Sequence, residues 1–472
     1  MTNPVLTMTQ NEVKPVPSMA EIAQFHARRR WAKVAWVYGS LLFVATLMLG
    51  TFVVAFLASL KDDPLEQPFK FNFAQVQPSN WGAAYQLGRE GNNAPMFGGF
   101  APGAAVNFTV TYAVEAGKEL KTPVIEVPRR RPGTGMAAAI VKDFAADYAQ
   151  VSEPVLVASN NNITFVQTRG NRQTTKQGHS QTWAFTIRYQ GDGPEIATLP
   201  LSVAAPAGQV LIDSTLAPTK MERRGRVAAW DNAAPGLIGY VFKSYVRVYT
   251  ESVSLTTGKS LFMSWTINSF FIAIGKVLLT LFFACTAGYA LARLKFTGAR
   301  AVFAFMLFSM MIPAQVTFIS NYLIYKNLGL LNTPWAVITA VIASGQVLIM
   351  KQFFENIPKE LEEAAIIDGA SPALILWKVF MPLAMPAILS VTILGFQGAW
   401  NDFFWPLVVI NSPVDAFTLP VGLLSLRNAY GFAGDWNLIL AGAFLSTLPV
   451  LLIFIIFQRY FVGNDISSAV KG

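Results

Sequence analysis

Seven polar, charged or amphipathic side chains lie within long apolar stretches of this sequence. Such groups are costly inside a membrane, so they commonly face a neighbouring helix or a water-filled path. Amides, charges and an indole ring can bind a polar solute in a cavity. Hydrogen bonding between helices needs the same residue types and is the competing interpretation. The seven candidates are Lys276, Gln315, Asn321, Gln397, Trp400, Asn401 and Asp402.

Lys276 is the least expected of these, because it stands near the middle of an apolar run at about 263–291. A charge at that depth must pair, reach water or cost about 2.5–3.5 kcal/mol on insertion scales. Two roles stay open: lining a solute path, or structural pairing with an interior acid such as Asp402. The cluster around Trp400 has a structural alternative too, because Pro406 follows it and frees backbone groups that need partners.

One tripeptide, Gly258-Lys-Ser260, superficially suits phosphate binding. A P-loop also needs a glycine five residues before the first of these, where its backbone forms an anion-binding nest, and Val253 stands there. We therefore expect no nucleotide site and no enzyme activity on this chain. We also expect no catalytic residue, no metal site and no bound cofactor.

The composition is that of a membrane protein. Of the 472 residues, 53% are hydrophobic and only 13% are charged, and several runs exceed the roughly eighteen apolar residues that indicate a membrane helix. The formal net charge is +9, but no basic face with interleaved aromatic residues emerges, so nucleic-acid binding is not expected. The single cysteine, Cys285, excludes an intrachain disulfide and suits a small core residue.

Six apolar runs are predicted to cross the membrane, and the basic residues indicate their direction. Arginines 28–30 and Lys33 precede the first run, which predicts a cytoplasmic N-terminus. With six crossings the C-terminus is cytoplasmic too, and among the short flanking loops only Lys326 is left outside. The runs lie at about 34–60, 263–291, 302–325, 335–350, 387–410 and 438–457.

The segment 61–262 falls on the outer side in this topology and is predicted to be one compact β-rich domain, most simply a sandwich. Alternation of apolar and polar residues predicts strands at 107–114, 162–167, 182–189, 198–203 and 209–212. The polar run that holds Gly170 and Gly178 suits a long hairpin, and 136–148 is a helical candidate. Arginine clusters at 129–131 and 223–226 are expected on solvated loops, with contact to an acidic partner as the alternative.

A short acidic segment, about 353–382, joins the fourth and fifth runs on the cytoplasmic side. Asn356 is expected to cap a helix that has Pro358 in its first turn. Gly369 should end that helix in a left-handed conformation, and Ser371 should cap the next helix, with Pro372 at its first position. The segment therefore presents a helix, a sharp turn and a second helix. One face of the first helix carries Leu361, Ala364, Ala365 and Asp368.

This segment resembles the EAA coupling loop of ABC importer permeases. In that family the short helix docks in a groove on the ATP-hydrolysing subunit and transmits its closure. Val379 and Met381 stand where the family usually has isoleucine and leucine, and an ordinary connecting helix is the alternative. The resemblance implies coupling contacts at Glu363, Ala364, Ala365, Asp368, Gly369, Met381 and Pro382.

Further stretches resemble the carbohydrate-type permeases, in particular the second permease subunit of maltose-type importers. They lie at 288–296, 400–407, 418–422, 458–461 and 469–472. The likeness is close over 264–472 and loose over 34–60. The segment 61–262 departs from the pattern, because subunits of this type usually have a short first outer loop.

The resemblance implies a multi-pass inner-membrane subunit of the ABC type I importer fold, with six transmembrane helices. Its expected partners are an ABC ATPase dimer that uses ATP and Mg, a second permease subunit in a heterodimer, an extracytoplasmic solute-binding protein and the lipid bilayer. The implied cargo is a sugar or oligosaccharide. The expected order is a cytoplasmic segment 1–33, helix 34–60, the outer insertion 61–262 and a five-helix core 263–472.

Three alternatives remain at this point. An ABC permease for a non-sugar solute would carry the same coupling loop, although the stretch 400–407 and the C-terminal residues favour carbohydrate. A secondary transporter would be expected to have an inverted repeat with broken helices, and no such repeat is visible. An anchored outer binding domain would lose all function if the insertion were deleted, whereas a permease could keep some.

Overall fold

The computed structural model forms two compact units, residues 1–56 and 57–472. The first holds most of α1 (Met19–Leu60), a continuous helix of 42 residues. The structure describes residues 19–61, 73–89, 96, 102–127, 149–169, 172–190, 199–205, 208–216, 218, 220–221, 227–250, 252–254, 256–340, 344–430 and 436–462. The helical candidate 136–148, both predicted arginine clusters and the stretch 469–472 lie outside these residues.

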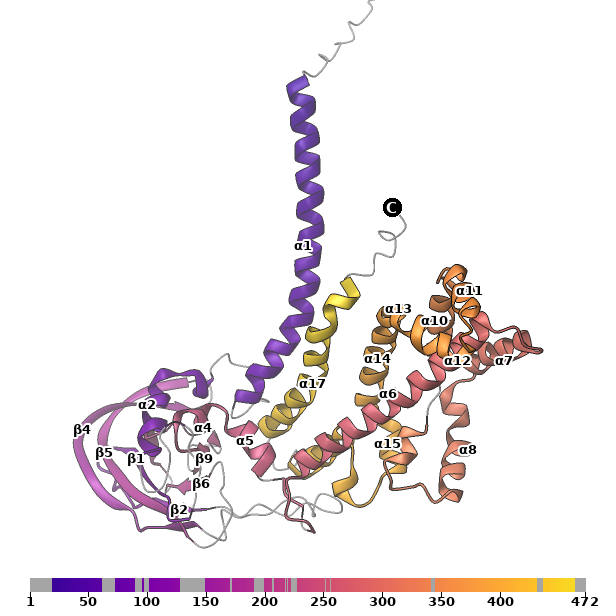
Figure 1. Ribbon diagram of the computed structural model, residues 1–472. Helices are drawn as coiled ribbons and strands as arrows, with labels where there is room; N and C mark the ends of the chain where they lie inside the picture. The colour runs from indigo at the N-terminus through magenta and orange to yellow at the C-terminus, as the bar shows by residue number, and fades with distance from the viewer. Residues whose placement is uncertain are drawn as a thin grey trace, which may run out of the picture. The chain divides into compact units, whose positions relative to one another are not determined.

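Two β-sheets share one apolar core in the segment 73–250 (Figure 1). The first sheet has the order β3-β5-β1-β7, with β4 also paired to β5, and the second has the order β2-β6-β9-β8. All the strand pairs are antiparallel. The strands are β1 (Ala105–Glu115), β2 (Val124–Glu126), β3 (Ala149–Val151), β4 (Val155–Arg169), β5 (Arg172–Tyr189), β6 (Leu199–Ala204), β7 (Val210–Ser214), β8 (Lys220–Met221) and β9 (Val227–Ala233).

The alternation of side chains in β1 explains how the two sheets meet. Val106, Phe108, Val110 and Tyr112 are all buried, because every second side chain of a strand points to the same face. From the other sheet, the Trp230 ring meets the ring of Phe108 edge-on, with 5.2 Å between centroids. Each strand predicted from the sequence overlaps an observed one, and β4 and β5 form the long hairpin that the polar run suggested.

The remaining elements are helical, and α6 is the longest of them within residues 57–462 that the structure describes. It packs against α10 and α14 (Figure 1). Their bounds are η1 (Ala74–Val76), α2 (Pro78–Leu87), α4 (Leu237–Val241), α5 (Lys243–Thr250), α6 (Leu261–Arg293), α7 (Ala299–Met311), α8 (Ala314–Asn327), α9 (Trp335–Ile338), α10 (Ser344–Glu355), α11 (Lys359–Ile367), α12 (Pro372–Ile375), η3 (Leu376–Phe380, a π-helical turn), α13 (Met381–Leu383), α14 (Met385–Trp400), α15 (Phe404–Val409), η4 (Val414–Ala416), α16 (Leu419–Tyr430) and α17 (Trp436–Val462).

Three of the predicted apolar runs are broken rather than continuous helices. The run 302–325 divides into α7 and α8, which bend by 104°, because Pro313 lacks an N–H and holds Ile312 in an extended conformation. The run 387–410 divides after α14, since Pro406 cannot donate the backbone bond that a continuous helix would need at Asp402. The run 335–350 divides into α9 and α10.

Within the described residues, three helical stretches are each long and apolar enough to cross a membrane: 33–60, 261–293 and 436–457. Two bent pairs of helices would raise this number to five if each pair is one span: α7 with α8, and 372–383 with α14, which bend by 81°. The large side chains of α1 from 34 to 54 are mostly exposed although they are apolar, which suits a lipid environment.

Candidate functional site

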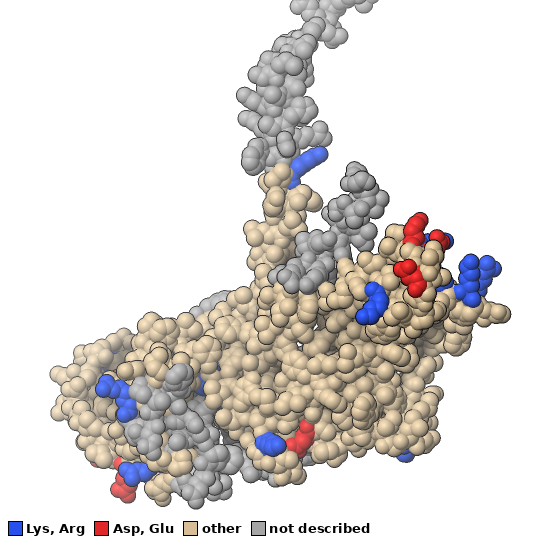
Figure 2. Space-filling view, in the orientation of Figure 1, with Lys and Arg blue, Asp and Glu red and all other residues tan. Residues whose placement is uncertain are grey.

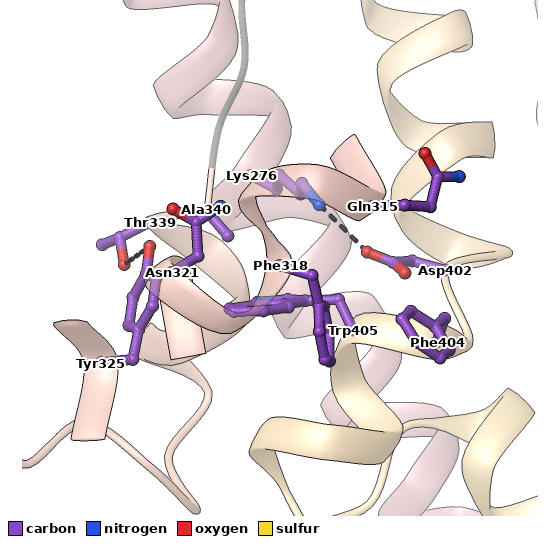
Figure 3. A pocket seen from close by; sticks show the side chains of 10 residues that line it. All are labelled: Lys276, Gln315, Phe318, Asn321, Tyr325, Thr339, Ala340, Asp402, Phe404 and Trp405. Atoms are coloured by element: carbon purple, nitrogen blue, oxygen red, sulfur yellow. Dashed lines mark hydrogen bonds and ion pairs between the residues drawn. The ribbon is translucent and has the colours of Figure 1, made fainter. Parts of the chain in front are cut away.

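A cavity of about 430 Å³ opens between the middle of α6, helix α8, the end of α9 and the break between α14 and α15 (Figure 3). The predicted runs 335–350 and 387–410 are broken here, after α9 and after α14. These breaks place Thr339, Asp402 and Trp405 in the wall of the cavity. Its lining residues are Lys276, Gln315, Phe318, Asn321, Tyr325, Thr339, Ala340, Asp402, Phe404 and Trp405.

An ion pair crosses one side of the cavity. The Nζ atom of Lys276 donates to Oδ2 of Asp402 over 3.2 Å, and each side chain keeps 21% of its surface exposed (Figure 3). The two residues are 126 positions apart in the chain. The structural pairing considered for Lys276 is therefore present, and the same side chain also lines the cavity. The remaining N–H groups of Lys276 and the other carboxylate oxygen of Asp402 offer donors and acceptors to a solute.

Aromatic rings form much of the remaining wall. The Trp405 ring meets Phe318 and Tyr325 edge-on, with centroids 5.8 and 5.5 Å apart, and its Nε1 donates to the carbonyl of Ala336 over 3.0 Å. A hydrogen bond of 3.2 Å joins the hydroxyls of Thr339 and Tyr325, and the Thr339 hydroxyl donates to the carbonyl of Trp335 over 2.6 Å. These contacts fix the rings in place, so the cavity combines rigid apolar faces with a few polar groups, as small-molecule sites commonly do.

Four of the seven residues selected from the sequence line this cavity: Lys276, Gln315, Asn321 and Asp402. The other three do not line it. Gln397 and Asn401 have exposed side chains on α14 and at its end. Trp400 is buried, stacks on Phe396 and donates from Nε1 to the carbonyl of Ser446 over 3.0 Å, so it packs the core instead.

The cavity also contains residues that the sequence reasoning missed. Trp405 and Phe404 stand in the stretch 400–407, which was singled out by resemblance, but only Trp400 was selected from it as a ring for a solute. Tyr325 ends the apolar run 302–325, Thr339 lies inside the run 335–350, and neither gave a local signal. Trp405 and Phe404 stand just before Pro406, a residue that interrupts helices, and this proximity is a sequence signal for them.

The acidic segment forms a second candidate site at one end of α6, and acidic side chains gather over α11 in Figure 2. The helix begins at Lys359 with Pro358 as its N-cap, so the expected cap at Asn356 is wrong, and so is the place of Pro358 in the first turn. The reason is that the backbone of Pro358 is extended, with ψ of 137°, which puts Asn356 two residues before the cap. Gly369 has φ of 79°, in the left-handed region that the turn requires. The Ser371 hydroxyl accepts from the Leu374 N–H over 3.3 Å, as expected.

Most of the residues assigned to coupling are accessible on this segment. The side chains of Glu363, Ala364, Asp368 and Pro382 are exposed, and those of Ala365 and Met381 are half-buried. Two large apolar side chains accompany them: Ile366 is 57% exposed and Ile367 is 85% exposed. These two neighbouring isoleucines form a small exposed apolar patch beside the carboxylates of Glu363 and Asp368.

Comparison with known proteins identifies the class of protein. The family model of the binding-protein-dependent transport system inner membrane component matches residues 277–463. An arabinooligosaccharide transport system permease protein of Halalkalibacterium halodurans is 32% identical over 292 residues, which covers 62% of this chain and 97% of that protein. The chain belongs to this family of inner-membrane ABC transporter permeases.

Other relatives are similar. An arabinooligosaccharide transport system permease protein of Bacillus subtilis is 34% identical over 228 residues, which covers 48% of this chain and 80% of that protein. A chain from the crystal structure of a bacterial ABC transporter involved in import of the acidic polysaccharide alginate is 28% identical. It covers 48% of this chain and 82% of that chain, with a TM-score of 0.42.

Proposed function

We propose that this chain is the membrane-spanning subunit of an ATP-driven importer that moves a sugar or oligosaccharide into the cell. The observation that carries the proposal is the exposed helix–turn–helix at 359–375, with its left-handed Gly369. A permease of this family needs a surface through which a separate ATPase can act on it. The similarity to two arabinooligosaccharide transport permeases supports a sugar as the cargo.

The proposed mechanism assigns separate roles to the two sites. Closure of an ATPase dimer on ATP and Mg moves α11 through contacts at Glu363, Ala364 and the exposed isoleucines. That movement switches the helices between inward-open and outward-open states, which requires that both sites bias the same two-state element. The cavity beside the Lys276–Asp402 pair passes the sugar, whose hydroxyl groups meet both the donors and the acceptors of the pair.

We further propose six crossings with both termini in the cytoplasm. Three spans are then broken: α7 with α8, which bend by 104°, α9 with α10, and α14 with α15. The breaks after α9 and α14 line the cavity through Thr339, Ala340 and Asp402, and irregular backbone at membrane depth is tolerated in such a place. The β-rich segment 61–262 becomes an insertion on the outer side. The partners of the whole chain in the assembly are a solute-binding protein and a second permease subunit, with which it forms a heterodimer.

Co-purification tests this proposal. The tagged wild-type chain is expected to bring down an ATPase and a second permease in mild detergent, as identified by mass spectrometry. The double variant Glu363→Lys, Gly369→Pro should lose the ATPase and keep the second permease. The matched control is Glu126→Lys, a charge reversal at an exposed residue of β2, which should keep both.

Two outcomes would change the assignment. If the wild type purifies without an ATPase and the double variant behaves identically, the segment is only a connector, and a secondary transporter or an anchored domain becomes the better account. If the ATPase binds but the co-purified binding protein recognises no sugar in a ligand screen, the permease serves a non-sugar solute.

A further inference from the structure

One guanidinium group joins the end of α6 to the acidic segment. Arg293 is the last residue of α6, and its side chain keeps only 5% of its surface exposed. Its Nε and one terminal nitrogen donate to the carbonyl of Phe354 over 3.1 and 2.6 Å. The same terminal nitrogen also donates to the carbonyl of Ile357.

The other side of this guanidinium meets α11 and the turn beyond it. The second terminal nitrogen lies 3.4 Å from Oε2 of Glu362, and the guanidinium carbon lies 5.1 Å from the centroid of the Phe380 ring. Phe380 ends the π-helical turn, and its ring meets the ring of Phe354 edge-on. Arg293 therefore contacts the chain just before α11, α11 itself and the turn that leads back to α14.

Adjacent glutamates on α11 have different surroundings. Successive residues of a helix point about 100° apart at 3.6 residues per turn. Glu362 accordingly faces Arg293 with 16% of its side chain exposed, whereas the side chain of Glu363 is exposed. The Glu362 carboxylate pairs with Arg293 of α6, whereas the Glu363 carboxylate is accessible to an external partner.

We propose that Arg293 is a positioning residue that fastens the acidic segment to α6, so that displacement of α11 by the ATPase also displaces α6. This inference rests on the proposed coupling function. Lys276 lies on the same helix, about 25 Å from Arg293 at roughly 1.5 Å per residue. A displacement of α6 therefore reaches the ion pair of the cavity through one continuous element.

The chemistry of arginine is essential to this role. The planar guanidinium presents several donors in a fixed fork, which serves two carbonyls and a carboxylate while one face covers an aromatic ring. A lysine ammonium keeps the charge but cannot reproduce those simultaneous contacts. Arg293→Lys therefore separates the positioning role from simple charge, and Glu362→Gln weakens one contact while the carbonyl contacts remain.

The test uses the complete importer in proteoliposomes with its binding protein and its own sugar, measuring sugar uptake and ATP hydrolysis in parallel. Arg293→Lys and Glu362→Gln should keep the bound ATPase and its hydrolysis, while sugar imported per ATP falls about 2- to 30-fold, more for Arg293→Lys. The matched control is Lys351→Met, because Lys351 is also a cation paired with a glutamate, Glu355, on its own helix α10, and its ammonium lies over the Phe303 ring of α7 rather than against α11. It should keep the wild-type ratio.

The ratio of uptake to hydrolysis distinguishes positioning from simple stabilisation. If Arg293 only stabilised the fold, its substitution would lower the thermal midpoint of unfolding and leave the ratio of uptake to hydrolysis unchanged. That result would overturn the inference. If Arg293→Lys does not accumulate, an unchanged ratio in Glu362→Gln would overturn it as well. Absence of ATP-driven uptake in the wild type would instead contradict the proposed function itself, and the inference with it.

Discussion

The Lys276–Asp402 pair yields a quantitative prediction through a double-mutant cycle of Lys276→Met and Asp402→Asn. At 3.2 Å and 21% exposure, the pair is neither fully buried nor free in water. Its gross attraction is about 5 kcal/mol at an effective dielectric constant near 20. Lost solvation offsets much of this, so a net coupling energy of about 1.5–3 kcal/mol is expected, as for other hydrogen bonds between charged groups.

Each single variant leaves one charge without its partner, whereas the double variant removes both. Asp402→Asn leaves Lys276 unpaired in the middle of α6, which costs about 2.5–3.5 kcal/mol on insertion scales if water does not reach it. The double variant should therefore be less destabilised than the sum of the single variants. The measurement is the free energy of unfolding of the purified full-length chain, titrated with denaturing detergent.

Additive effects within about 0.5 kcal/mol would refute the reasoning, because that is the behaviour of residues that do not interact. Sugar uptake supplies a second readout. Lys276→Met should reduce uptake while the complex still assembles, because the cavity loses its cationic donor. Normal uptake by an assembled Lys276→Met complex would contradict a role for Lys276 in the solute path.

Three other predictions concern single residues. Trp405→Leu should lower sugar uptake by up to about tenfold with normal assembly, because an aromatic contact is worth about 0.5–1.5 kcal/mol and about 1.4 kcal/mol corresponds to tenfold in rate. Unchanged uptake would remove the ring from the path. A Cβ atom on Gly178 would lie 1.8 Å from the carbonyl oxygen of Val114, so Gly178→Ala should force β1 and β5 apart and make the β-rich segment sensitive to limited proteolysis. The control Gly82→Ala should not have this effect, because its Cβ would meet no atom within 4 Å. Burial raises the pKa of Tyr112 from 10.0 to about 12, so the neutral phenol stabilises the fold fully below pH 10, and that stability is lost as the pH rises towards 12. Limited proteolysis across this pH range should show the loss of stability in the wild type and a smaller loss in Tyr112→Phe. Equal losses would refute the role of Tyr112.

Local chemistry made several features predictable from the sequence. The run at about 263–291 is observed as α6, Leu261–Arg293, because an apolar stretch without proline or internal glycine pairs continues as one helix. Gly369 and Ser371 act as expected because turn and cap preferences depend on neighbouring residues only. The strands of the β-rich segment were visible for the same reason, through alternation along each strand.

Features that depend on distant residues were not predictable in the same way. Hydropathy alone did not reveal the bends at Pro313 and before Pro406, although proline chemistry explains them once the helices are known. Trp405 and Thr339 line one cavity from separate elements. Their spacing in the sequence does not predict that they lie close together. The different surroundings of Glu362 and Glu363 depend on Arg293, which closes another helix.

The most direct test of the central claim is ATP-driven uptake by proteoliposomes that contain this chain, the co-purified ATPase and second permease, and the binding protein. The cargo is a radiolabelled sugar that the binding protein recognises. We predict uptake that requires ATP inside the vesicles in the orientation that exposes α11 to the lumen, and its loss in the Glu363→Lys, Gly369→Pro variant. Uptake that proceeds without ATP, or that follows an ion gradient instead, would contradict the assignment of this chain as an ABC importer permease.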